Sequence, residues 1–163
     1  MTAVTEGQLL WQPTEERKAA SEIVRYMHWL RAKKGLSFDS YESLWQWSIR
    51  ELEAFWESIW QFYDIQASAP YKRVLDARRM PGAKWFEGAH LNFTQQLLQH
   101  RANPGPAIIA FSELRPQTEL SWPELEAAIG AASAGLRALG VKPGDRVVSY
   151  LPNIVETTIA LFA

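Results

Sequence analysis

The spacing of apolar residues divides the chain into a helical first part and a second part in which strands and helices alternate. Between residues 14 and 63 apolar residues recur at intervals of three and four, the period of an amphipathic helix. A first helix is predicted from Thr14, which can cap it, to Gly35, which can end it. Its apolar face consists of Ala19, Ile23, Tyr26, Met27 and Leu30.

Two more helices are predicted in this first part. A short helix is expected from about Tyr41. Ser48 and Glu51 have the spacing of a capping box, which indicates the start of the next helix. Its stripe, expected to be buried core, consists of Leu52, Phe55, Trp56, Ile59, Trp60 and Tyr63.

Residues 64–106 show little regular pattern and are interrupted by proline and glycine. We expect an irregular connector that runs over the surface of a partner domain. The exception is a helix that Asn92 caps and that extends to about His100, with Leu97 and Leu98 on its inner side.

From residue 107 the pattern predicts alternating strands and helices. Residues 107–111 form a first strand and residues 119–121 return as a second. Ser121 and Glu124 form a capping box for a helix that ends at Gly140. Its inner face consists of Leu125, Ala128, Ile129, Ala132, Leu136 and Leu139. A further strand is predicted over residues 146–151, and a last helix with Asn153 as cap and Glu156 as its third residue.

This order of elements predicts a right-handed βαβ crossover and the start of a mostly parallel sheet. The fold class is therefore α/β: a helical N-terminal segment followed by the first βαβ elements of a larger domain. Residues 157–163 carry no Gly, Asn or basic residue that would close a helix. We therefore expect the chain to be truncated, the opening part of a longer protein.

Composition narrows the class of protein without giving a function. A net charge of −1 over 163 residues gives no reason to expect nucleic acid or anionic membrane as a partner. The chain has no cysteine, which excludes disulfides and thiolate chemistry, and no secretory signal or membrane-spanning apolar run, so we expect a cytoplasmic protein. Six of the eight tryptophans lie between Trp11 and Trp60, and such a segment is suited to covering another part of a larger molecule.

Few residues suggest chemistry. Basic residues gather around Asp76, at Lys72, Arg73, Arg78, Arg79 and Lys84. Such a cluster is most often a solvated surface, and the alternative is a phosphate contact. The segment from Gly130 to Gly135 is not followed by the Lys-Ser/Thr of a phosphate-binding loop.

No catalytic, cofactor-binding or metal-binding residue is predicted. The three histidines, His28, His90 and His100, are far apart and lack ligand spacing. The acidic pairs Glu51/Glu53 and Glu124/Glu126 are two residues apart, which places their members on different helix faces.

The run LRALGVKPGDRVVSYLPNIVE, residues 136–156, resembles the early segment of the adenylate-forming family of acyl-CoA ligases. Val155 departs from that pattern, where the family more often has proline. Residues 120–125 resemble the hairpin and helix start that precede it, and residues 85–93 are similar to the W-F-x-G-x-x-L-N segment of short-chain acyl-CoA synthetases. Residues 10–17, 41–48, 55–62 and 80–86 together resemble the acetoacetate-specific members of that family.

The resemblance implies a two-step ligase that uses ATP, CoA and Mg²⁺. Acetoacetate and ATP would form an acyl-adenylate and diphosphate, and CoA would then displace AMP. It implies that residues 1–106 are a helical cap and connector and that residues 107–163 begin an incomplete AMP-binding (adenylation) domain. The partners would be the rest of that domain, a small C-terminal domain and a small-molecule acid. The family's phosphate loop, ribose-binding acids and catalytic lysine have no counterpart here, so the chain alone is expected to be inactive.

Two alternatives remain open. The family could be right and the acid different, with acetate or propionate as substrate. The chain could also be a non-catalytic module that binds a partner through its tryptophan-rich surface.

Overall fold

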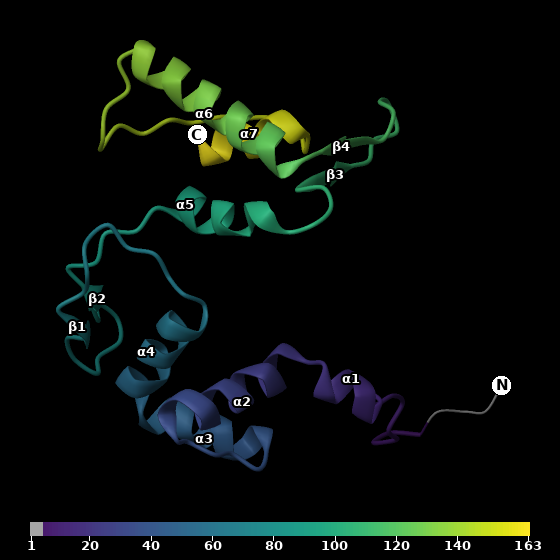
Figure 1. The fold of residues 1–163 in the computed structure, drawn as a ribbon, viewed down its shortest axis with the longest axis vertical. Helices are drawn as coiled ribbons and strands as arrows, with labels where there is room; N and C mark the ends of the chain where they lie inside the picture. The colour runs from purple at the N-terminus through teal and green to yellow at the C-terminus, as the bar shows by residue number, and fades with distance from the viewer. Residues whose placement is uncertain (1–4) are drawn as a thin grey trace. The chain divides into compact units, whose positions relative to one another are not determined.

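The structure is a computed structural model that describes residues 5–163. Contacts divide the chain into two compact units. The first unit extends to Ile65 and takes in Pro70–Ala89, and the second comprises Gln66–Ala69 and His90–Ala163. Each unit has its own helices and its own β-hairpin, labelled in Figure 1.

The first unit contains four helices, and its core lies among the second, third and fourth of them. The helices are α1 (Glu15–Ala19), α2 (Glu22–Lys34), α3 (Tyr41–Arg50) and α4 (Leu52–Phe62). Tyr26 and Leu30 of α2 and Leu44 of α3 are buried at the centre, and Phe55, Ile59 and Phe62 of α4 pack against them. Gly35 ends α2 in the left-handed conformation, as predicted.

Two helix boundaries differ from the prediction. The first helix is interrupted at Ala20 and Ser21, where the Ser21 hydroxyl donates to the Lys18 carbonyl and competes with the helix pattern. Ser48 does not start a helix. It lies inside α3, where its hydroxyl donates to the Trp45 carbonyl at 2.8 Å, and the break occurs at Glu51.

The predicted stripe of α4 is only partly buried. Trp56 and Tyr63 are exposed, whereas Ser58 is buried and accepts a hydrogen bond from the Tyr26 hydroxyl. The Ser58 hydroxyl itself donates to the Phe55 carbonyl at 2.6 Å, which leaves Tyr26 as the donor of the first bond. Burial raises the pKa of Tyr26.

A hairpin that the sequence did not predict completes the first unit. Strands β1 (Arg73–Leu75) and β2 (Trp85–Glu87) pair antiparallel, with Arg73 opposite Glu87 and Leu75 opposite Trp85. Aromatic contacts among Trp60, Tyr71 and Phe86 join the hairpin to α4.

The second unit contains α5 (Phe93–Leu98), the 3-10 helix η1 (Gln99–Ala102), β3 (Ile108–Ala110), β4 (Thr118–Leu120), α6 (Trp122–Ala138) and α7 (Val155–Phe162). Strands β3 and β4 pair antiparallel, Ile109 opposite Glu119. The capping box of Ser121 and Glu124 begins α6 as predicted, and Asn92 caps α5.

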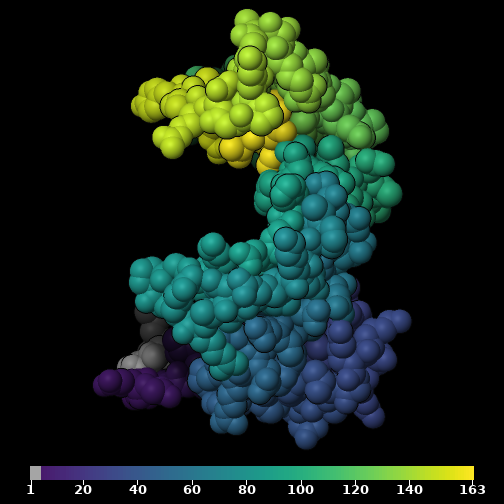
Figure 2. Space-filling model, turned by 90° about the vertical axis from the view of Figure 1, so that its left-hand side faces the viewer, coloured from purple at the N-terminus to yellow at the C-terminus, as the bar shows by residue number. Residues whose placement is uncertain are grey.

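The last part of this unit departs from the prediction. Residues 146–151 have no regular secondary structure and no strand partner among the described residues, so the expected parallel pairing is not formed within them. A strand needs a neighbour for its amide and carbonyl groups, which an apolar pattern alone cannot supply. Val148 is 89% exposed, and this stretch, yellow-green in Figure 2, lies at the surface of its unit.

Two further details of the second unit differ from expectation. Helix α7 begins at Val155 with Ile154 as its cap residue, instead of Asn153, and the Thr157 hydroxyl donates to the Pro152 carbonyl. Leu139, expected on the inner face of α6, is 83% exposed. Leu125 and Ile129 of that face are buried.

The mixed helix and strand content agrees with the predicted class. Within residues 5–163, every helix is too short or too polar to cross a membrane.

Candidate functional site

The residues that could carry catalysis or metal binding remain apart in the structure. His28 lies in α2, His90 pairs with Ala69 in an isolated bridge, and His100 lies in η1. In the described part of the chain no three His, Asp or Glu side chains come together as a metal site. Gly130 and Gly135 lie inside α6 and form no loop.

The acidic pairs also keep separate roles. Glu124 accepts from both the amide and the hydroxyl of Ser121, which lowers its pKa, while Glu126 pairs with Arg101 of η1 at 3.4 Å. Glu51 lies between α3 and α4 and Glu53 in the first turn of α4. No acid and base pair for proton transfer results from either set.

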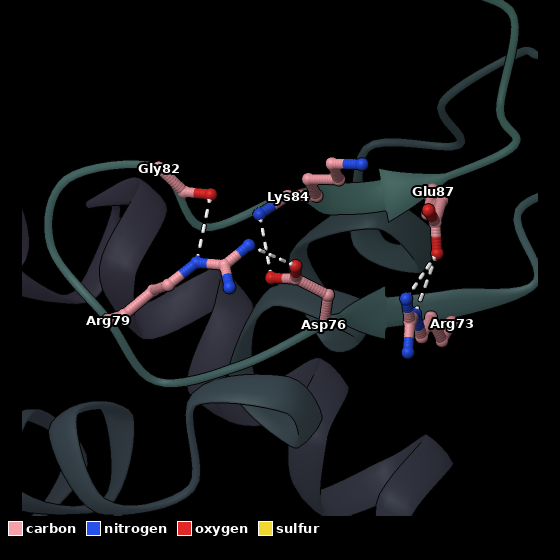
Figure 3. Close-up of polar contacts among 6 residues, drawn as sticks. All are labelled: Arg73, Asp76, Arg79, Gly82, Lys84 and Glu87. Carbon is pink, nitrogen blue, oxygen red and sulfur yellow. Dashed lines mark hydrogen bonds and ion pairs between the residues drawn. The ribbon is translucent and has the colours of Figure 1, made fainter.

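The basic cluster singled out in the sequence lies on and beside the β1–β2 hairpin, and Figure 3 draws its members Arg73, Arg79 and Lys84. Arg73 and Glu87 face each other across the two strands. The Arg73 Nε donates to a Glu87 carboxylate oxygen at 2.7 Å. This exposed cross-strand pair closes the open end of the hairpin.

Asp76 organises the loop at the other end of the hairpin. One carboxylate oxygen accepts from the Lys84 amide at 2.8 Å and the other from the Arg79 guanidinium at 2.7 Å. The Asp76 amide in turn donates to the Lys84 carbonyl at 3.1 Å, and the Arg79 Nε donates to the Gly82 carbonyl at 3.1 Å. Figure 3 shows Asp76 between the two sides of the loop.

These contacts set the charge state of Asp76. The Lys84 amide is the main cause of its lowered pKa, with the Arg79 charge a further cause. Its side chain is only 9% exposed, against 53% for Arg79. The carboxylate is therefore ionised at neutral pH and holds residues 76–84 as a closed loop, which we call the Asp76 loop.

Arg78 fastens the Asp76 loop to the helices. Its guanidinium donates to the carbonyl of Arg50, the last residue of α3, at 2.5 Å. The three guanidinium groups of the cluster thus all have acceptors within the chain. The cluster works as a set of structural contacts at an exposed surface, and a phosphate contact stays a prediction.

The first unit contains several hollows. One, of about 370 Å³, lies among α2, α3 and α4 and is lined mainly by aromatic and aliphatic side chains, including Tyr26, Trp45 and Phe55. The carboxylate at its edge, Glu22, is hydrogen-bonded to Arg25, which lowers its pKa.

The second hollow, of about 410 Å³, lies beside the Asp76 loop. Its apolar lining includes Leu52, Leu75, Met80 and Trp85, and its charged lining is Arg78 and Arg79. We call it the arginine-rimmed hollow. The sequence did not predict this hollow because β1 and β2, which help to form it, are only three residues long. The basic residues were also considered without the loop that brings them together.

Comparisons with known proteins agree with the resemblance found in the sequence. Residues 41–97 match the family described as acetyl-coenzyme A synthetase N-terminus, and residues 98–163 match the AMP-binding enzyme family. The acetoacetyl-CoA synthetase of Danio rerio is 32% identical over 163 residues, which cover 98% of this chain and 24% of that protein. The acetoacetyl-coenzyme A synthetase of Rhizobium meliloti (strain 1021) is 33% identical over 154 residues, 94% of this chain and 24% of that protein.

A solved structure gives the same result. The acetoacetyl-CoA synthetase from Streptomyces lividans matches with a TM-score of 0.89 and 40% sequence identity over 95% of this chain and 24% of that one. The chain thus spans about a quarter of the length of the curated relatives it matches.

Proposed function

Because the chain is homologous over nearly its whole length to the N-terminal quarter of the acetoacetyl-CoA synthetases, we propose that it forms this part of an ATP-dependent acetoacetate–CoA ligase. The observation that carries the proposal is the agreement in fold and sequence with the Streptomyces lividans enzyme along 95% of the chain. The reaction would join acetoacetate to CoA through acetoacetyl-AMP, with release of diphosphate and then AMP.

The chain's own part in this reaction is structural. ATP and CoA would be bound by the parent enzyme, and we assign no residue of this chain to either. The described residues hold no group of three or more acidic or histidine side chains suited to Mg²⁺. By itself the chain would be inactive.

We further propose a division of labour along the chain. Residues 1–106 would form a helical cap with its connector, and residues 107–163 would begin the adenylation domain. In the assembled enzyme residues 146–151 would pair with strands of the remaining domain, because their apolar side chains and free backbone groups fit an inner strand. A small C-terminal domain would complete the protein, and a cytoplasmic location stays a prediction.

Acetate is the alternative substrate, and a family match supports it. Residues 41–97 match a family described by acetyl-coenzyme A synthetase, so acetate is the alternative acid, with propionate next to it. The non-catalytic module proposed for the tryptophan-rich surface would show no turnover with any acid.

The test is diphosphate release by the full-length protein encoded at this locus, with ATP, CoA and a panel of acids. We expect acetoacetate to give the highest kcat/KM, and the 163-residue chain alone to give none. Highest turnover with acetate would change the substrate. An encoded protein without a Gly/Ser/Thr-rich phosphate loop, or without activity on any short acid, would overturn the ligase proposal.

A further inference from the structure

We propose that the arginine-rimmed hollow is a docking site for an acidic peptide segment that carries one apolar anchor residue. This surface lies on the β1–β2 hairpin and the start of α4, and the inference does not depend on the ligase proposal.

The Asp76 loop presents its tip in a fixed conformation. Asp76 closes the loop through Lys84 and Arg79, and Arg78 ties it to the end of α3. Because these bonds already fix the loop, a partner would not have to order it, and binding would lose less conformational entropy. The Met80 side chain at the tip is 96% exposed.

The hollow behind the tip is suited to one apolar side chain. Leu52 and Leu75 contribute apolar lining, and the exposed Met80 and Trp85 contribute soft and aromatic walls. Buried anchor residues of this kind carry much of the energy of peptide recognition. Methionine is unbranched and adapts to the shape of a bound side chain.

Charge selects an acidic partner. The Asp76 loop carries three cations, Arg78, Arg79 and Lys84, and one anion, which gives a net charge of 3 − 1 = +2. Both oxygens of Asp76 accept hydrogen bonds within the loop, so its carboxylate is already occupied.

The guanidinium groups keep donors for a partner. Within the chain Arg78 donates through one N–H and Arg79 through two, and each guanidinium has five. On the helix side Glu51 and Glu53 flank Leu52, which would direct the acidic residues of the peptide toward the loop.

A peptide fits these features better than an anionic membrane. A membrane-binding loop gains energy from several apolar side chains that enter the lipid, whereas this tip offers Met80 with a hollow behind it. The hollow would receive the apolar side chain of the peptide, and the cations of the Asp76 loop would lie beside its acidic residues.

The experiment is NMR of the whole chain labelled at the methionine methyl groups and the tryptophan indoles. The probe is the blocked peptide GEELEEG. Its controls are GEESEEG, which lacks the anchor, and GQQLQQG, which lacks the charge. We expect saturable shifts of the Met80 methyl and Trp85 indole signals and no shift of Met27, which packs in the α2 core. Each control peptide should bind at least about fivefold more weakly, the loss of roughly 1 kcal/mol.

Variants separate recognition from folding. Met80→Ser and Lys84→Gln change exposed side chains and should each weaken binding by about threefold to tenfold. Leu114→Ser, at a site 95% exposed in the second unit, is the matched control and should leave it unchanged. Equal binding of the three peptides, absence of saturable shifts, or Met80 shifts with phosphatidylserine vesicles and not with the peptide would overturn the proposal.

Discussion

The Asp76 loop and residues 146–151 are both irregular stretches, and they differ in whether their backbone groups have hydrogen-bond partners. In the loop, one carboxylate binds a backbone amide and a guanidinium, so nine residues are held without regular structure. Over residues 146–151 no described side chain or strand accepts from the backbone, and Val148 is 89% exposed. An irregular segment can thus be ordered by a hydrogen-bond acceptor close in sequence. An apolar segment such as residues 146–151 needs a strand partner from elsewhere in the sequence for its backbone groups.

The two segments should differ most directly in amide hydrogen exchange. The Lys84 amide donates to Asp76, and the Asp76 amide donates to the Lys84 carbonyl. We expect both to exchange at least about tenfold more slowly than the amides of Val147 and Val148, measured by NMR and corrected for intrinsic rates. Equal protection would remove the contrast between the two segments.

Leu30→Ala tests the core that supports the Asp76 loop. Leu30 is fully buried in the α2 core, and its truncation should lower the free energy of unfolding by about 3 kcal/mol. Urea unfolding followed by tryptophan fluorescence is the measurement, because seven of the eight tryptophans lie in the first unit.

The matched control is Leu139→Ala, whose side chain is 83% exposed in the second unit. It should change stability by no more than about 0.5 kcal/mol, followed by circular dichroism. A similar loss for both leucines would contradict the described burial.

Tyr26→Phe should have a smaller effect. It removes the hydroxyl that donates to Ser58 and leaves the ring in place, at a cost of about 1 kcal/mol. Tyr150→Phe, at a fully exposed site, is the control for the substitution itself. An unchanged urea midpoint for Tyr26→Phe would mean that the α2–α4 hydroxyl pair contributes nothing to stability.

Asp76→Asn should have the smallest effect on stability, and one that depends on pH. The pKa of Asp76 is lowered from 3.8, so its contribution is complete above that value and is lost as the pH falls through the folded-state pKa. The wild-type chain should exceed the variant in urea midpoint at pH 7, and the two should converge as the pH falls through the folded-state pKa of Asp76. If the difference in urea midpoint between the two chains does not change with pH, the effect of the substitution comes from the shape of the side chain and not from its charge.

Local signals explain which elements the sequence predicted. The capping box of Ser121 and Glu124, the cap Asn92 and the stop Gly35 all act within one helical turn, and all three were predicted. Ser48 has the same capping spacing but lies inside α3, because a serine hydroxyl can also bond to a carbonyl one turn back.

Non-local pairing explains the misses. Three-residue strands are too short to show a period of two, so the β1–β2 hairpin was not visible, and residues 146–151 have the pattern of a strand without a partner. The basic cluster was found, but the role of Asp76 depends on the approach of Lys84, eight residues away. That no residue of this chain is catalytic stays a prediction.

The aromatic junction of Trp60, Tyr71 and Phe86 has a consequence for biosynthesis. It connects α4 to a hairpin that follows it closely in sequence. The hydrogen bond between Tyr26 and Ser58 in the same unit also joins residues only 32 positions apart. Short separations of this kind favour rapid collapse. The N-terminal unit can therefore reach its native form on the ribosome once Ala89 has cleared the exit tunnel, before the second unit is complete.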